Sequence, residues 1–153
     1  MNPFSLSIAE LESRARSIRR RIIVLNAESP AGGHTGADLS QVELLTALYF
    51  RILNCSPQLK DSDERDIYIQ SKGHAVGGYY CVLAEAGFIP VEWLSTYQHA
   101  DSHLPGHPVK HKTPGIEPEH WSAGAWPAGG GGDRAGRETQ QQQTPGVCGD
   151  RRR

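Results

Sequence analysis

Apolar side chains recur at helical spacing near the start of the chain. Their steps alternate between four and three residues, which is the repeat of one buried helix face. Ser7 and Glu10 precede the stripe in the arrangement of a capping box. The pattern predicts an amphipathic helix whose stripe faces the core. The stripe consists of Leu11, Ala15, Ile18, Ile22 and Leu25.

A second set of elements follows in the order typical of an α/β domain. Ser40–Glu43 offers another capping box before an apolar helix that covers Leu44–Leu53. Asp66–Gln70 is a short β-prone run. Ala75–Ala86 is expected to be a helix with Tyr79, Val82, Leu83 and Ala86 inward. Pro90 suits the start of a further helix through Trp93 and Tyr97. The predicted class is α/β, with its remaining strands absent from this part.

The composition changes abruptly after Glu117. Residues 118–153 contain no Leu, Ile, Met or Phe, and Val147 is their only branched aliphatic residue. Runs of four glycines and four glutamines, Gly129–Gly132 and Gln140–Gln143, lie in the same segment. Such a segment buries too little apolar surface to offset the entropy of ordering. We therefore expect a domain over residues 1–117 and a disordered tail over 118–153.

Charge and cysteine content exclude several classes of protein. The 16 basic and 17 acidic residues give a net charge of −1, which provides no general field for nucleic acid or membrane. No apolar stretch approaches the roughly 20 residues that span a bilayer, and the N-terminus lacks signal-peptide features. Five arginines between residues 14 and 21 are interpreted as a solvated helix face, with an anion or partner site as the alternative. Three scattered cysteines fit a reducing, cytoplasmic setting.

Histidines in turns are the main candidates for chemistry. His34 lies in the glycine-rich turn Ala31–Gly36, where backbone N–H groups can approach an anion. Lys72, Gly73 and His74 follow the predicted strand and precede a helix. In α/β sheets, ligands bind beyond the carboxyl ends of strands, and helix N-termini attract phosphate. The alternatives are a flexible interhelical loop and a plain strand-to-helix connection.

A third group of histidines recurs every four residues. Pro105, Gly106 and Pro108 forbid a continuous helix, so the spacing does not create one metal-binding face. A zinc site on a single helical turn that carries His99 and His103 remains an alternative. A loop that presents His103 and His107 to a polar ligand is favoured. The group consists of His99, His103, His107 and His111.

Four motifs in register resemble the N-terminal portion of transketolases, especially the separate N-terminal subunit of split bacterial enzymes. The S-G-H-P-G loop of that family corresponds to the turn at His34, where Thr35 departs from the pattern. The family's S-K-G-H turn is intact at Ser71–His74. P-G-H-P and T-P-G-[VI]-E follow at Pro105–Pro108 and Thr113–Glu117. The resemblance covers roughly residues 9–117.

The resemblance implies a three-layer α/β/α thiamine diphosphate-binding fold, of which this chain is the incomplete N-terminal part. It implies transfer of a two-carbon ketol unit between sugar phosphates, with thiamine diphosphate and Mg²⁺ as cofactors. His74, with Lys72 and Gly73, would lie beside the diphosphate. His34 and His107 would act in catalysis, and His103 would join them at the sugar substrate. The implied partners are further copies in a homo-oligomer and a C-terminal transketolase subunit.

The family's next motifs are absent after Glu117. Gly149-Asp150-Arg151 stands where a metal-binding G-D-G is expected, without a strand before it. When the tail is back-translated and read one base later, it can yield T-G-A-L-G-H-G and T-G-D-G in one frame. We therefore hypothesise a one-nucleotide frameshift, with a genuine divergent tail as the alternative.

The chain as written is accordingly expected to be poorly soluble and to lack turnover alone. Two alternatives of other kinds remain open. One is a histidine-rich metal-binding module that uses His99, His103 and His111. The other is a non-catalytic regulatory subunit that pairs with a full transketolase through its amphipathic helices.

Overall fold

Four α-helices organise the part of the chain that the computed structural model describes, namely residues 4–59, 62–109 and 112–116. They are α1 (Ile8–Glu28), α2 (Thr35–Leu39), α3 (Val42–Ala47) and α4 (Val76–Glu85). A π-helical turn, Leu48–Ile52, continues α3, and three short 3-10 helices cover Pro57–Leu59, Gly73–Ala75 and Val91–Thr96. The predicted boundary after 117 and the tail lie outside the described residues.

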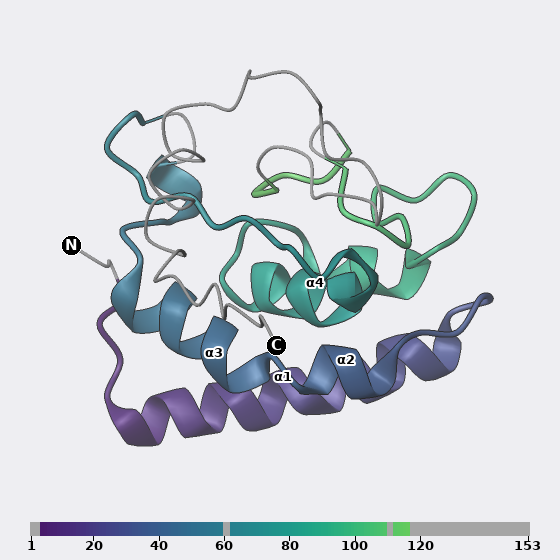
Figure 1. The fold of residues 1–153 in the computed structure, drawn as a ribbon, viewed down its shortest axis with the longest axis horizontal. Coiled ribbons are helices and arrows are strands. Elements are labelled where there is room, and N and C mark those ends of the chain that lie inside the picture. The colour runs from purple at the N-terminus through teal and green to yellow at the C-terminus, as the bar shows by residue number, and fades with distance from the viewer. Residues whose placement is uncertain (1–3, 60–61, 110–111, 117–153) are drawn as a thin grey trace, which may run out of the picture. The chain divides into compact units, whose positions relative to one another are not determined.

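Helix α4 is the centre of this arrangement. Residues 76–84 are all buried, because α1, α2, α3 and the 3-10 helix Val91–Thr96 pack around α4 (Figure 1). A helix that is apolar on every side is stable only when it is enclosed in this way. The predicted inward positions Tyr79, Val82 and Leu83 are confirmed, each at most 1% exposed.

Helix α1 confirms the stripe and its cap. Ala15, Ile18, Ile22 and Leu25 are buried against the core. The Glu10 N–H donates to Ser7 Oγ at 3.4 Å, and the Ser7 N–H donates to the Glu10 carboxylate at 2.8 Å. At 21 residues α1 is the longest helix, yet no helix within the described ranges is long and apolar enough to cross a membrane.

The arginine run is more than a solvated face. Arg14 and Arg21 both pair with Glu85 at the end of α4, and Arg19 pairs with Glu43 of α3. The Glu85 side chain is only 8% exposed, so these pairs fasten α1 to the buried helix. Three of the five arginines therefore contact other helices and do not serve only as a solvated face.

The Ser7→Ala variant is expected to lose about 1 kcal/mol of unfolding free energy, because the Glu10 N–H loses its acceptor and the Ser7 hydroxyl no longer donates to the Glu10 carboxylate. Urea unfolding followed by circular dichroism measures the change. Ser17→Ala, within the same helix, serves as the matched control and should leave the midpoint nearly unchanged. An equal loss in both variants would contradict the capping role.

The second predicted capping box is wrong. Ser40 ends α2 with a helical backbone (φ −65°, ψ −16°), whereas an N-cap needs an extended one. Its hydroxyl instead donates to the Ala37 carbonyl at 2.7 Å. The following apolar face is also narrower than expected, since Leu44 and Ile52 are 60% and 62% exposed. The wider π-helical turn after Ala47 changes which side chains face inward.

The predicted strand over Asp66–Gln70 is not formed in the described residues, and neither is any other strand. The segment keeps the alternation of one, with Tyr68 and Gln70 turned inward and Ile67 and Ile69 at 44% and 41% exposure. A strand requires a neighbour to complete its hydrogen-bonded ladder. The described part of the chain therefore does not show the predicted α/β class. The helix expected after Pro90 also differs from the prediction, because Val91–Thr96 is a 3-10 helix.

Candidate functional site

The turns at His34 and His74 meet, although 40 positions separate them in the sequence. His34 directly precedes α2, and His74 lies in the 3-10 helix that leads into α4. The two imidazole rings contact edge to face, with centroids 5.2 Å apart and planes at 80°. Both side chains are exposed. The packing of α2 on α4 thus creates a pair of solvent-facing histidines.

A buried carboxylate lies at the base of this pair. Asp38 of α2 is 0% exposed and accepts hydrogen bonds from the Gly78 N–H at 2.8 Å and from Asn26 Nδ2 at 2.9 Å. Burial raises the pKa of Asp38, while the two hydrogen bonds and the nearby His34 and His74 oppose that rise. Asp38 therefore caps the N-terminus of α4 and places negative charge close to both imidazoles.

Asn26 and Gly33 complete the floor of the site. Asn26 Nδ2 also donates to Thr35 Oγ1 at 3.3 Å, which ties the end of α1 to the start of α2. Asn26 Oδ1 is buried and has no hydrogen-bond partner among the described residues. A side chain at Gly33 would overlap this oxygen, so glycine is required directly before His34. The close approach explains the glycine in this turn.

Asn26 and Asp38 were not predicted as site residues. Asn26 lies four residues after Ile22, so the buried stripe continues into a polar residue, and this signal was available in the sequence. Asp38 has no such signal, because its burial depends on α4 packing over α2. Both support the histidine pair from below.

The turn that carries Lys72 and Gly73 rests on a glutamine network. Gln41 Nε2 donates to the Ala75 carbonyl at 2.5 Å, and Gln70 Nε2 donates to Gln41 Oε1 at 2.8 Å. Gly73 is buried, whereas Lys72 is exposed and its Nζ donates to Ser40 Oγ at 3.1 Å. The buried amides fix the backbone of the turn and leave the Lys72 ammonium at the surface.

The third histidine region is a loop, as favoured. His103 and His107 are both exposed, and the His103 ring stacks on Trp93 with centroids 4.4 Å apart. The 3-10 helix ends at Thr96, so His99 and His103 do not share a helical turn. No group of three metal-ligating side chains occurs within the described ranges, and His111 lies outside them.

The donor set at the histidine pair suits an anion. The exposed Lys72 ammonium and two imidazoles are groups that bind phosphate oxygens. The N–H of Gly78 already donates to Asp38, so the first turn of α4 offers fewer free donors than a bare helix end. A diphosphate therefore fits the side chains of this turn. A divalent metal finds no matching ligand cluster in the described part.

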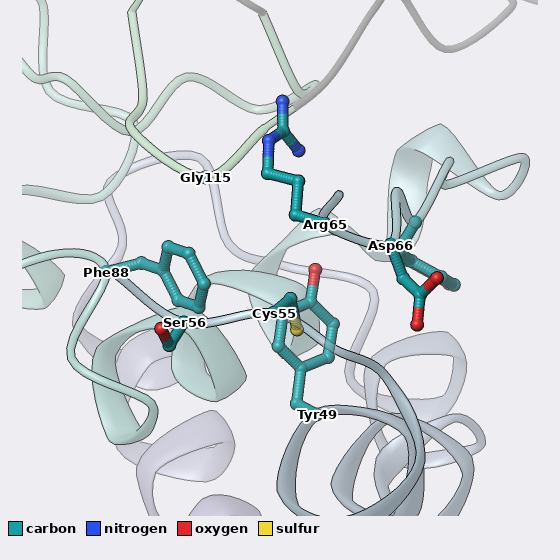
Figure 2. Close-up of a pocket in the computed structure, with 8 residues that line it drawn as sticks. Tyr49, Cys55, Ser56, Arg65, Asp66, Phe88 and Gly115 are labelled. Carbon is teal, nitrogen blue, oxygen red and sulfur yellow. The ribbon is translucent and has the colours of Figure 1, made fainter. Parts of the chain in front are cut away.

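One cavity of about 40 Å³ lies elsewhere (Figure 2). Its wall includes the rings of Tyr49 and Phe88, whose centroids are 6.0 Å apart, and the thiol of Cys55. This volume suits a water molecule rather than a cofactor. Burial raises the pKa of Cys55 to about 11, so the thiol is not poised as a nucleophile.

Comparison with known proteins defines the class of this chain. The model of the transketolase thiamine diphosphate binding domain matches residues 12–127. The chain belongs to the transketolase family.

Several relatives of this chain are named as transketolase subunits. An apulose-4-phosphate transketolase subunit from Actinobacillus succinogenes is 73% identical over 117 residues, which cover 76% of this chain and 42% of that protein. The 6-deoxy-6-sulfo-D-fructose transketolase subunit SqwG of a Clostridium species is 37% identical over 71% of this chain and 39% of its own length. The chain thus spans about two fifths of these relatives.

A solved structure agrees with the family. Transketolase from Leishmania mexicana matches 72% of this chain and 16% of its own, with a TM-score of 0.61 and 26% identity. This match supports the thiamine diphosphate-binding fold, although the described part of this chain contains only helices and loops.

Proposed function

We propose that this chain is the N-terminal part of a transketolase subunit that moves a two-carbon ketol unit between sugar phosphates. The single observation that carries the proposal is the exposed His34–His74 pair, 5.2 Å apart above the buried Asp38. The names of the apulose-4-phosphate and sulfofructose relatives support a sugar phosphate or a similar anionic sugar as the substrate class. Their designation as subunits supports a C-terminal partner subunit.

The residues divide into two groups by chemistry. Lys72, Gly73 and His74 would hold the diphosphate, because an ammonium and an imidazole flank a glycine in one turn. Thiamine diphosphate, when bound, supplies a thiazolium that acts as an electron sink. His34 and His107 would hydrogen-bond the sugar and move protons at its hydroxyl and carbonyl oxygens, since imidazole titrates near neutral pH. The exposed His103 would contribute a further sugar contact.

The remaining parts of the proposal come from the sequence. Mg²⁺, a homo-oligomer and a cytoplasmic setting accompany the proposed activity. The segment after Glu117 is inferred to result from a one-nucleotide frameshift, supported by the two family motifs that one shifted frame recovers. A fresh read of the coding DNA from the Glu117 codon to the stop tests this directly. Codons that fail to give T-G-A-L-G-H-G and T-G-D-G one base later would overturn the frameshift.

The His74→Ala variant is expected to weaken thiamine diphosphate binding about 10- to 100-fold, because a charge-assisted hydrogen bond to the diphosphate is lost. Isothermal titration calorimetry on the frame-corrected subunit, mixed with its C-terminal partner and Mg²⁺, measures the affinity. His99→Ala is the matched control, because that histidine is exposed and lies outside the proposed diphosphate turn.

Two results would count against the proposal. Equal affinities for His74→Ala and His99→Ala would remove His74 from the cofactor site. Turnover by the chain as written, without a partner, would overturn its inferred inactivity.

A further inference from the structure

Gln98 has a backbone conformation that residues other than glycine rarely adopt. Its φ is +62°, in the left-handed region. Ser5, at the N-terminal edge, is the other non-glycine residue with positive φ in the described ranges. Gln98 instead lies between the 3-10 helix Val91–Thr96 and the turn that carries His107. Unfavourable backbone conformations persist only where surrounding contacts enforce them, and they cluster at functional sites.

The contacts that enforce this conformation reach the loop of His34. Gln98 Oε1 accepts a hydrogen bond from Ser29 Oγ at 2.9 Å, and the bond is partly buried. Ser29 is the C-cap of α1 and opens the loop that leads to His34. The Gln98 N–H donates to the Leu104 carbonyl at 2.9 Å and so closes the loop that leads to His107. One residue therefore joins the two histidine loops.

Gly106 fits against the same side chain. A Cβ at Gly106 would lie 3.1 Å from Gln98 Nε2 and 3.6 Å from its Cδ, so the turn packs directly on the amide. On α4, the Tyr80 hydroxyl donates to the Pro105 carbonyl at 2.9 Å. The turn before His107 is thus held between Gln98 and α4, the helix that follows His74.

We propose that Gln98 is a positioning residue that fixes the His107 turn relative to the His34 loop through its bond to Ser29. This inference rests on the proposed function for its catalytic meaning, because both histidines then contact one sugar phosphate. The left-handed backbone is retained because it aims the Gln98 side chain at Ser29 while the main chain closes the loop to Leu104. The bridge itself is a property of the fold and can be measured without substrate.

Two variants of the full chain distinguish the loss of the Gln98–Ser29 hydrogen bond from the relief of backbone strain at Gln98. Gln98→Gly removes the bridge but adopts positive φ freely, so its unfolding midpoint should stay equal or rise. Ser29→Ala removes the same hydrogen bond from the other end. Ser95→Ala is the matched control, since the Ser95 hydroxyl bonds only within its own 3-10 turn, at 2.8 Å to Glu92 O.

Amide hydrogen exchange and the histidine side-chain NMR signals provide the readout. Both Gln98→Gly and Ser29→Ala should speed exchange of the Leu104 amide, which donates to Ser102 Oγ at 2.9 Å in the loop that Gln98 closes, roughly fivefold, the effect of one lost hydrogen bond. Both should shift the signals of His34 and His107, and the double variant should add little. A stabilised Gln98→Gly with a loosened turn is a result that a purely structural role does not produce.

Several results would overturn the inference. Unchanged exchange of the Leu104 amide in Ser29→Ala would show that no bridge couples the loops. Fully additive effects in the double variant would show that Ser29 and Gln98 act separately. The proposed function is tested apart, by titrating the frame-corrected subunit, together with its C-terminal partner, with D-ribose 5-phosphate. If the histidine signals do not respond to this sugar phosphate while the two loops remain coupled, the proposed function is wrong and the Gln98–Ser29 bridge is still supported.

Discussion

The Gly78→Ala variant is expected to lose about 3 kcal/mol of unfolding free energy. A Cβ at this position would lie 2.8 Å from the Asp38 carbonyl oxygen and 3.1 Å from the Asp38 Cα. Both are backbone atoms of α2, so the clash is relieved only if α2 and α4 move apart. That movement also breaks the 2.8 Å bond from the Gly78 N–H to Asp38. The melting temperature should fall by roughly 10–20 °C.

The control for this prediction is Gly36→Ala. A Cβ at Gly36 meets nothing within 4 Å, and alanine is favoured over glycine inside a helix by up to about 1 kcal/mol. Thermal unfolding by calorimetry compares the two variants, and the edge-to-face contact of His34 with His74 is followed by NMR. Gly78→Ala should lose that contact and Gly36→Ala should keep it. Equal melting temperatures would show that the α2–α4 approach is not tight.

Local sequence signals predicted the elements that depend on local interactions. Helix α1 and its Ser7–Glu10 box were readable because the stripe and the cap belong to one segment. The segment over residues 66–70 was misjudged as a strand because its alternation is local, whereas a ladder needs another strand. Ser40 was misjudged for a related reason: its side chain suits an N-cap, but the preceding helix α2 holds its backbone in the helical conformation.

The sequence predicted the exposed residues of the candidate site but not the buried residues that support them. Glycine-rich and S-K-G-H turns pointed to His34 and His74, and the structure brings these rings together. The supporting layer came from tertiary packing. Asp38 is buried because α4 covers α2, and Gln98 is held in a left-handed conformation by contacts that reach back to Ser29. Neither environment is encoded within a window of neighbouring residues.

The buried charge of Asp38 is expected to lower the stability of the fold, whereas the hydrogen bonds that Asp38 accepts raise that stability. Burial raises the pKa of Asp38 above 3.8, so the folded state favours the protonated form. The contribution of this group to stability is therefore highest below pH 3.8. It declines as the pH rises toward the raised folded pKa and stays low above it. Asp38→Asn removes the titration and should lack this decline.

The two substitutions at Asp38 separate charge from hydrogen bonding. Asp38→Ala should lose about 2–4 kcal/mol, because the Gly78 N–H is left buried without an acceptor and Asn26 Nδ2 keeps only its 3.3 Å bond to Thr35 Oγ1. Asp38→Asn keeps an oxygen for Gly78, and the unpartnered Oδ1 of Asn26 can accept from the new amide once Asn26 reverses.

Urea unfolding of wild type and both variants from pH 3 to pH 8 tests this division. The stability of Asp38→Asn relative to wild type should increase with pH, because only wild type carries a buried charge. A difference between them that does not vary with pH would mean that the Asp38 carboxyl titrates alike in the folded and unfolded chains. His34 and His74 both lie close to this carboxylate. The destabilisation therefore persists at neutral pH, because it comes from the same negative charge that lies beside His34 and His74.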